Sequence, residues 1–127
     1  MNYTFVNLTN HPSARWSDTQ RLAALEYGPI QDLPFPAISA HDTLEYISRL
    51  AAVYLEKLKA IENPVVLIQG EAVFTYELVR LLEQTGIPAL AAVSRRQVQE
   101  TVLPDGTTQK TAYFVFEGFR PYWIFRT

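Results

Sequence analysis

Two adjacent arginines are the first residues in this chain that could do chemistry. Arg95 and Arg96 follow Ser94 directly, and an apolar run from Ala89 to Val93 precedes all three. Guanidinium groups at the end of a strand can form paired hydrogen bonds with phosphate oxygens, and the Ser94 hydroxyl adds a donor. The arginines could equally be a solvated surface pair, which contributes little to stability. Their place after a strand favours a phosphate-binding role.

A second polar segment, Thr9-Asn10-His11-Pro12-Ser13, follows the apolar residues near the N-terminus. His11 can act as a general base or as a hydrogen-bond donor to phosphate, and Asn10 and Ser13 stand beside it. Loops carry binding and catalytic residues more often than the elements that they connect. We therefore expect these three side chains to take part in ligand binding, whereas His41 is expected at the solvent-facing start of a helix.

The third polar segment, Gln69-Gly70-Glu71, follows the apolar run Val65-Val66-Leu67-Ile68. Gly70 removes a side chain where the N-terminus of a helix could accept an anion. Glu71 in the first helical turn would complement the helix dipole, which is an equally good structural explanation. Ligands of open α/β sheets bind outside the carboxyl ends of the strands, so all three polar segments are expected at one edge of the sheet.

Several reaction classes are excluded by what the sequence lacks. The absence of cysteine excludes disulfides, thiolate zinc sites and a cysteine nucleophile, and two histidines are too few for a histidine-rich metal site. The P-loop, the dinucleotide-binding glycine motif and the Gly-x-Ser-x-Gly nucleophile elbow are also missing. We therefore expect neither a metal nor a cofactor.

The composition is that of a globular chain with a slightly acidic balance. The 127 residues are 48% hydrophobic and 19% charged, and the formal net charge is -2. This length predicts a single domain, residues 1–127. The negative charge argues against binding of long nucleic acids, although not against a local basic pocket. No apolar segment is long enough to span a membrane, and no signal peptide is present, so a cytoplasmic location without a membrane partner is expected.

The elements that must position the polar segments alternate between strands and helices. Strands are predicted at Tyr3 to Leu8, Ile30 to Leu33, Val65 to Ile68 and Ile87 to Val93. The run from Val65 to Ile68 is apolar on both faces, which suits an inner parallel strand. Pro104-Asp105-Gly106 predicts a hairpin between Gln97 to Leu103 and Thr107 to Phe116. The aromatic tail, Tyr113 to Phe125, is expected to cover one edge of the sheet.

Helices are predicted between these strands. Ser17-x-x-Gln20 forms a capping box for the first helix, and Gly28 is its expected C-cap. Ser39-x-x-Asp42 predicts the start of the second helix, and the third begins at Gly70-Glu71 and closes at Gly86. The order β-α-β-α-β-α-β followed by a hairpin predicts a three-layer, Rossmann-like α/β fold with an open, mainly parallel sheet.

Together these segments resemble a known family. The chain carries Asn7-Leu8-Thr9-Asn10-His11-Pro12-Ser13, then Trp16 and Gln20, then Gln69-Gly70-Glu71 and Ser94-Arg95-Arg96. This order is similar to that of small stand-alone CRISPR-associated proteins of type III systems, which are related to CARF (CRISPR-associated Rossmann-fold) domains. The likeness covers most of the chain as an order of elements. The motifs are short, and no effector domain follows the sensor as it does in larger members.

The resemblance implies a ligand, a cyclic oligoadenylate and above all cyclic tetra-adenylate, the second messenger of type III CRISPR immunity. CARF-like proteins bind it across the two-fold axis of a homodimer, which could assemble further. By this likeness the messenger's phosphates, ribose or ring would meet Asn10, His11, Ser13, Gln69, Gly70, Glu71, Ser94, Arg95 and Arg96. The implied function is to modulate antiviral signalling by sequestering or degrading the messenger.

Other functions stay open at this point. One is a metal-independent ring nuclease, in which a ribose 2′-hydroxyl attacks the neighbouring phosphodiester, Arg95 or Arg96 stabilises the charge, and His11 assists proton transfer. Another is a nucleotide or sugar-phosphate enzyme, which would need a carboxylate or metal pair at the strand ends, where only Glu71 is available. A third is a protein-interaction module that uses the aromatic tail.

Overall fold

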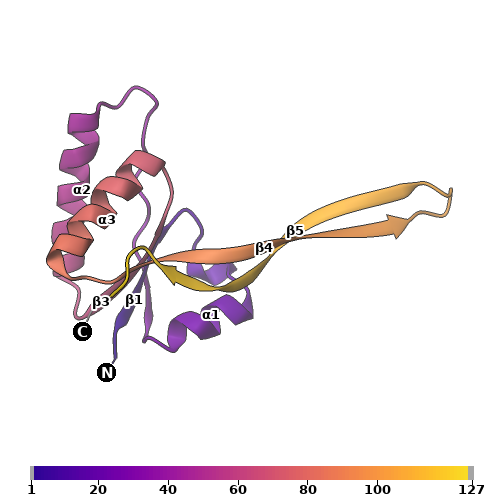
Figure 1. Ribbon diagram of the computed structural model, residues 1–127, viewed down its shortest axis with the longest axis horizontal. Helices are drawn as coiled ribbons and strands as arrows, with labels where there is room; N and C mark the ends of the chain where they lie inside the picture. The colour runs from indigo at the N-terminus through magenta and orange to yellow at the C-terminus, as the bar shows by residue number, and fades with distance from the viewer. Residues whose placement is uncertain (1, 126–127) are drawn as a thin grey trace.

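Strands and helices alternate along the chain in the computed structural model, which describes residues 2–125. The strands are β1 (Thr4–Thr9), β2 (Ile30–Asp32), β3 (Pro64–Gln69), β4 (Ala89–Val102) and β5 (Thr108–Pro121). The helices are the 3-10 helix η1 (Ser13–Arg15), α1 (Asp18–Leu25), α2 (Leu44–Lys59) and α3 (Ala72–Thr85), and Figure 1 shows their arrangement. The predicted order of elements is confirmed up to β4, which combines the predicted fourth strand with the first strand of the predicted hairpin.

Within residues 2–125 the strands form one mixed, mostly parallel sheet in the order β2-β1-β3-β4-β5. β1 runs parallel to β2 and β3, and β3 runs parallel to β4, whereas β5 pairs with β4 in the antiparallel direction. The predicted inner position of Val65 to Ile68 is confirmed, because β3 lies between β1 and β4 and these residues are buried. The fold is therefore α/β.

Alternation along the inner strands sends side chains to both faces of the sheet. The face towards α2 and α3 carries one buried cluster, which includes Val6, Leu8, Val66 and Ile68. The face towards α1 carries another, which includes Phe5, Val65, Leu67, Trp16 and Ala24. Helices therefore cover both faces of the sheet, as Figure 1 shows, and the chain has three layers as predicted.

The predicted start of α1 is confirmed, but its predicted end is wrong. Ser17 caps the helix by accepting a hydrogen bond from the Gln20 N–H at 3.2 Å. The helix ends at Leu25, so Gly28 is not its C-cap. Gly28 instead lies against the backbone of Tyr3, just before β1, where an added Cβ would be 1.6 Å from the Tyr3 carbonyl oxygen. Close approach of two backbones, and not a helix end, requires glycine at this position.

The predicted cap of α2 is wrong, and the predicted end of α3 is confirmed. Thr43 caps α2, because its hydroxyl accepts from the Tyr46 N–H at 3.1 Å. Ser39 and Asp42 form a separate turn before the helix, in which the Ser39 N–H donates to Asp42 Oδ2 at 2.7 Å. Gly86 closes α3 with a φ of 80°, which glycine adopts without steric strain.

The predicted hairpin is confirmed, but β4 is much longer than predicted. Ser94, Arg95 and Arg96 lie inside β4 and not in a loop after it, because β5 pairs with the whole segment from Val102 back to Leu90. A register shift between Val93 and Ser94 faces Gly118, whose φ is 151°. Such a bulge bends and twists a strand pair, and the pair leaves the sheet here.

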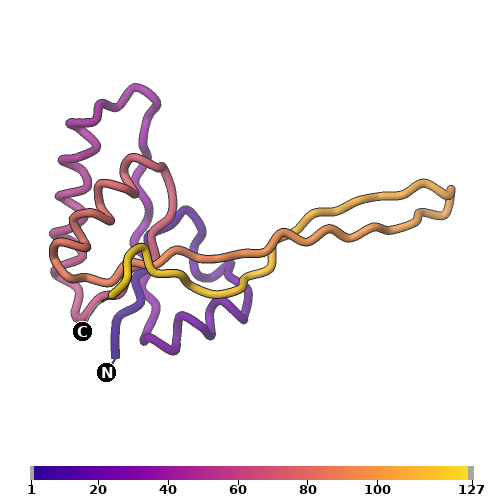
Figure 2. Tube along the Cα trace, viewed as in Figure 1, coloured from indigo at the N-terminus to yellow at the C-terminus, as the bar shows by residue number. Residues whose placement is uncertain are grey.

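We call residues 94–118 the arm and the rest of the described chain the body. Figure 2 shows the arm projecting from the body as a long two-stranded ribbon, with the turn at its far end. The aromatic tail covers the edge only in part: β5 forms the edge, and the Tyr122 hydroxyl donates to the Ile68 carbonyl. No helix within residues 2–125 is long and apolar enough to cross a membrane.

Candidate functional site

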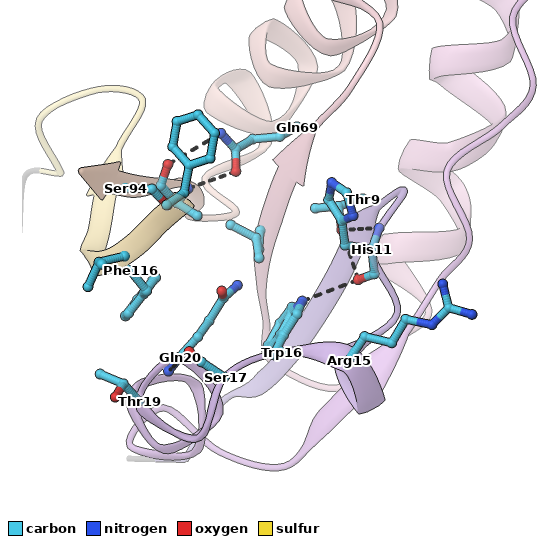
Figure 3. Close-up of a pocket in the computed structure, with 14 residues that line it drawn as sticks. Thr9, His11, Arg15, Trp16, Ser17, Thr19, Gln20, Gln69, Ser94 and Phe116 are labelled. Carbon is cyan, nitrogen blue, oxygen red and sulfur yellow. Dashed lines mark hydrogen bonds between the residues drawn. The ribbon is translucent and has the colours of Figure 1, made fainter. Parts of the chain in front are cut away.

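The carboxyl ends of β1 and β3 meet where the order of strands changes direction. Thr9 at the end of β1 pairs with Gln69 at the end of β3, and β2 and β4 lie on opposite sides of this pair. Open α/β sheets bind their ligands at such a point. A pocket of about 720 Å³ opens here on the α1 face of the sheet, and Figure 3 shows it from close up. We call it the edge pocket.

Three parts of the chain line the edge pocket. They are the ends of the inner strands, the first turn of α1 with the segment before it, and the base of the arm. The lining residues used below are Thr9, His11, Arg15, Trp16, Gln20, Gln69, Ser94, Phe114 and Phe116. In Figure 3 the Gln20 side chain rises from α1 into the pocket, and Arg15 extends outward at the rim.

A hydrogen-bond network fixes the loop that carries His11. The His11 carbonyl accepts from Asn7 Nδ2 at 2.9 Å, from Thr9 Oγ1 at 3.2 Å and from Trp16 Nε1 at 3.2 Å. Asn7 is buried, and its amide also donates to Asp32 Oδ1 at 3.0 Å. A satisfied network of buried polar groups is rigid. The backbone of His11 and the Trp16 ring are therefore held in place before any ligand binds.

The charge of the edge pocket favours an anion. The ionisable side chains that line it are His11 and Arg15, and the described lining residues include no carboxylate. Both side chains are exposed, and neither has an ion-pair partner within residues 2–125. The N-terminus of α1, which is the positive end of its helix dipole, lies at the pocket and also favours an anion. Asp18 in the first turn of α1 partly offsets this effect. An incoming phosphate therefore meets the Arg15 guanidinium and the His11 imidazole, with no carboxylate among the described lining residues.

Three of the predicted site residues, His11, Gln69 and Ser94, come together in the edge pocket. Gln69, however, already uses its side-chain amide inside the protein. Its Oε1 accepts from the Ala92 N–H at 2.9 Å, and its Nε2 donates to the Ala92 carbonyl at 3.3 Å. Gln69 thus extends the pairing of β3 with β4, a role that its place in the sequence did not reveal.

Two other predicted residues lie on the far side of the β1–α1 loop. Ser13 donates from its hydroxyl to Asp32 Oδ2 at 3.1 Å. Asn10 lines a separate pocket of about 310 Å³, which Asp32 also lines. Asp32, the last residue of β2, therefore organises this loop, and the sequence analysis did not single it out.

The two predicted arginines diverge because they are neighbours on a strand. Arg95 points to the face opposite Ser94, where it pairs with Glu117 at 2.6 Å. Arg96 shares the face of Ser94 but lies farther out along the arm, and it does not line the edge pocket. Their predicted clamp on phosphate stays a prediction, and Arg15 is the arginine that the fold places at the pocket.

Gly70 and Glu71 serve the opposite face of the sheet. A Cβ at Gly70 would lie 2.3 Å from the Phe35 ring, so Phe35 fills the space that the prediction reserved for a ligand. Glu71 is the N-cap of α3, and its Oε1 accepts from the Phe74 N–H at 2.7 Å. Both residues therefore have roles in folding.

The predicted ligand set omits Arg15, Trp16 and Gln20, which the structure places on the edge pocket. One signal could have found them. Ser17 caps a helix only a short connection after β1, so the first turn of that helix must sit at the carboxyl end of the strand. Trp16 belongs to the buried cluster on the α1 face and also lines the pocket. Within residues 2–125 no group of three or more His, Cys, Asp or Glu could hold a metal ion.

Comparison with known proteins places the chain in a family. No curated protein and no solved structure matches it. A family model, described as the uncharacterized protein MJ1673 family, matches residues 3–120. The match takes in the edge pocket and the whole arm, and it stops one residue before the end of β5. The chain therefore belongs to the uncharacterized protein MJ1673 family.

Proposed function

We propose that this chain binds a cyclic oligoadenylate in the edge pocket and thereby modulates type III CRISPR signalling. One observation carries the phosphate-binding part: a pocket at the switch in strand order whose ionisable lining residues, His11 and Arg15, face no carboxylate among the described residues. The adenine, the ring and the link to CRISPR rest on the resemblance of the sequence. The proposal includes a Rossmann-like classification, which the strand order and the helices on both faces support.

The lining supplies partners for both halves of a nucleotide. Arg15 can pair with phosphate through charge-assisted hydrogen bonds, and Gln20 and Ser94 add polar groups. Phe114 and Phe116 provide aromatic faces, and Phe114 is 71% exposed, so its ring is free to stack on a base. Phosphate on one side and aromatic rings on the other is the arrangement that nucleotides need.

The volume of the edge pocket bears on the size of the ligand. Pockets for drug-sized ligands measure about 300–1,000 Å³, and the edge pocket measures about 720 Å³. One pocket thus suits part of a ring of several nucleotides. A two-fold homodimer would present two such pockets, which matches a ring with the same symmetry.

A ring nuclease is the second candidate, because His11 and Arg15 line the same pocket. In this reaction the ribose 2′-oxygen bonds to the adjacent phosphorus, and the bond from phosphorus to the 5′-oxygen breaks. The 2′-hydroxyl loses a proton and the leaving 5′-oxygen gains one, a transfer that His11 can assist. Arg15 would stabilise the negative charge that builds on phosphate in the transition state.

The test is titration calorimetry of the full chain with cyclic tetra-adenylate, with linear tetra-adenylate and with AMP. Cyclic tetra-adenylate is expected to bind most tightly. Loss of a charge-assisted contact costs about 1.5–3 kcal/mol, so Arg15→Ala should weaken binding by roughly ten- to a hundredfold. The matched control is Arg49→Ala, which removes an exposed arginine from α2 on the other face of the sheet.

Two results would overturn the proposal. One is the absence of binding heat for every nucleotide. The other is equal affinity of Arg15→Ala and Arg49→Ala. Incubation of labelled ring without divalent metal separates the two candidates: cleavage by the wild type that His11→Ala loses, with most of its affinity kept, identifies the nuclease. An intact ring after hours with tight binding identifies sequestration.

A further inference from the structure

The two faces of the arm differ in character. Residues paired across an antiparallel ribbon share a face. On the face that continues from the edge pocket, the successive pairs are Ser94 with Phe116, Arg96 with Phe114, Val98 with Ala112, Glu100 with Lys110, and Val102 with Thr108. Five of these ten residues are apolar, namely Phe116, Phe114, Val98, Ala112 and Val102. On the opposite face only Tyr113 and Val115 are apolar, beside Arg95, Gln97, Gln99, Thr101, Gln109 and Thr111. We call the first the apolar face of the arm.

The apolar face is open to solvent along its length. Every residue from 98 to 114 is exposed, and Val98 and Val102 are 48% and 73% exposed. An isolated two-stranded ribbon is marginally stable in water, and it gains stability when a further layer covers its apolar side. Within residues 2–125 nothing supplies that layer beyond the base of the arm, so a partner molecule that covered this face would stabilise the arm.

We propose that this layer is the apolar face of the arm of a second copy of the chain. The two-fold axis of this dimer lies between the two ribbons at the level of Val98 and perpendicular to the strands, so the two arms run in opposite directions. The order of side chains along β4 supports this partner. Arg96 and Glu100 are equally far from Val98 on its two sides, so the axis sets Arg96 opposite the partner's Glu100. Isologous contacts are reciprocal, and each dimer therefore gains this pair twice.

The same axis orders the residues on β5. Ala112 pairs with Val98 and lies at the centre, where a small side chain lets two ribbons approach. Phe114 then faces the partner's Lys110, an arrangement in which an ammonium group meets an aromatic ring. Arg96 has no ion-pair partner within residues 2–125, and Glu100 and Lys110 form only an exposed contact at 3.5 Å. The charged groups are thus available for the second copy.

The balance of charge favours a copy of this chain over a nucleic acid. The arm carries Arg95, Arg96 and Lys110 against Glu100, Asp105 and Glu117, three charges of each sign. Binding to a phosphate backbone requires an excess of positive charge. A surface that packs against itself requires both signs, placed so that a two-fold axis brings opposite charges together.

The dimer also bears on the proposed function. The inference that the two copies share a ligand site rests on that proposed function. If the arms run in opposite directions about Val98, Val102 and Thr108 near the tip of one arm face Ser94 and Phe116 at the base of the other. Ser94 and Phe116 line the edge pocket. The turn of each arm therefore forms a wall at the mouth of the partner's edge pocket, and the complete site contains residues from both copies.

Sedimentation equilibrium of the full chain without ligand tests the interface. The wild type is expected to be a dimer at micromolar concentration. Val98→Glu places two carboxylates opposite each other at the axis and should raise the dimer dissociation constant at least about tenfold. Gln99→Glu adds the same charge to the next residue on the polar face and is the matched control, with a change of less than about twofold.

A charge exchange makes the test independent of folding defects. Arg96→Glu and Glu100→Arg should each weaken the dimer, because like charges then meet across the axis. The double variant should restore most of the affinity, since the two exchanged side chains again meet opposite charges on the other copy. A monomeric wild type, a dimer that Val98→Glu leaves intact, or a double variant weaker than both single variants would overturn the interface.

Calorimetry with cyclic tetra-adenylate then separates this inference from the proposed function. Val98→Glu should bind the ring at least about tenfold more weakly than Gln99→Glu does, because its edge pocket lacks the partner's wall. Equal affinity would overturn the shared site, even if the dimer exists. A dimer that obeys the charge exchange but binds no nucleotide would overturn the proposed function and leave the interface standing.

Discussion

β3 and the outer part of β4 are strands of one sheet, and they lie in opposite environments. Val66 in β3 is fully buried, whereas Val102 near the tip of the arm is largely exposed. β3 has a strand on each edge and helices over each face, while the outer part of β4 has one partner strand and no covering layer within residues 2–125. Both regions thus form strands, but they differ in the number of layers that surround them.

The residue pattern already distinguishes the two regions. Val65-Val66-Leu67-Ile68 is apolar at every position, as a strand buried on both faces must be. Arg96-Gln97-Val98-Gln99-Glu100 has a single apolar residue, so this part of the arm cannot form a hydrophobic core of its own. The body therefore holds its own hydrophobic core, and the arm presents one side that a partner can complete.

The largest expected effect comes from an aromatic residue of the body. Phe5 is fully buried, and its ring lies 5.5 Å from that of Tyr27 and 5.1 Å from that of Phe119. Phe5→Ala should lower the free energy of unfolding by about 3–5 kcal/mol, because it leaves a cavity in the core. Urea unfolding followed by circular dichroism measures this loss.

The matched change in the arm is Tyr113→Ala, on the face that the proposed dimer leaves free. It should change the free energy of unfolding by less than about 0.5 kcal/mol. Both variants are compared at one protein concentration. Similar losses from the two variants would mean that the arm is part of the cooperative core, and the contrast between body and arm would be wrong.

A smaller effect is expected from two glycines. Gly28→Ala should destabilise the body by about 1–3 kcal/mol, since its Cβ would meet the Tyr3 backbone and force a shift. Gly106→Ala should cost about 1 kcal/mol, and only in the turn of the arm, because its φ is 87° and the space around it is open. Hydrogen exchange of the amides should place the first effect in the body and the second in the arm. Loss of protection in β1 caused by Gly106→Ala would contradict this.

The last expected effect, about as large as that of Gly106→Ala, concerns the hydroxyl that ties the C-terminal segment to β3. The Tyr122 hydroxyl donates to the Ile68 carbonyl, and Tyr122→Phe should cost about 1 kcal/mol near neutral pH. Burial raises the pKa of Tyr122 above its ordinary value of 10.0. Stability from this group is thus complete below the pKa of the unfolded chain and is lost as pH rises through the folded pKa.

The alkaline part of this prediction is measured by urea unfolding at about pH 8 and about pH 11. Tyr122→Phe should lose less stability between the two than the wild type does. The decline should not vanish, because burial, followed by the charge of Glu26, also raises the pKa of Tyr27. Tyr113→Phe removes a hydroxyl from the arm and serves as the control. An alkaline decline in Tyr122→Phe as steep as that of the wild type would contradict the assignment.

Much of the site escaped prediction because its residues are brought together by long-range contacts. His11, Gln69 and Ser94 were expected at the carboxyl edge of the sheet, and they line the edge pocket. Arg15 was not expected there, although the Ser17 cap shortly after β1 places the start of α1 at this end of the strand. The arginines at 95 and 96 were expected in a loop because a polar Ser-Arg-Arg segment carries no local sign of continuing as a strand.

Residue types alone were sufficient for the order of strands and helices, the inner place of β3, the hairpin turn and the ends of α3. These features depend on apolar periodicity, capping and turn preferences, which act over a few neighbouring residues. Only the tertiary structure decided that Tyr3 lies against Gly28 and that Phe35 fills the space at Gly70. It also decided that β4 continues as a strand beyond Arg96, because β5 pairs with it there. Each of these choices depends on residues distant along the chain, whose contacts exist only after the sheet has formed.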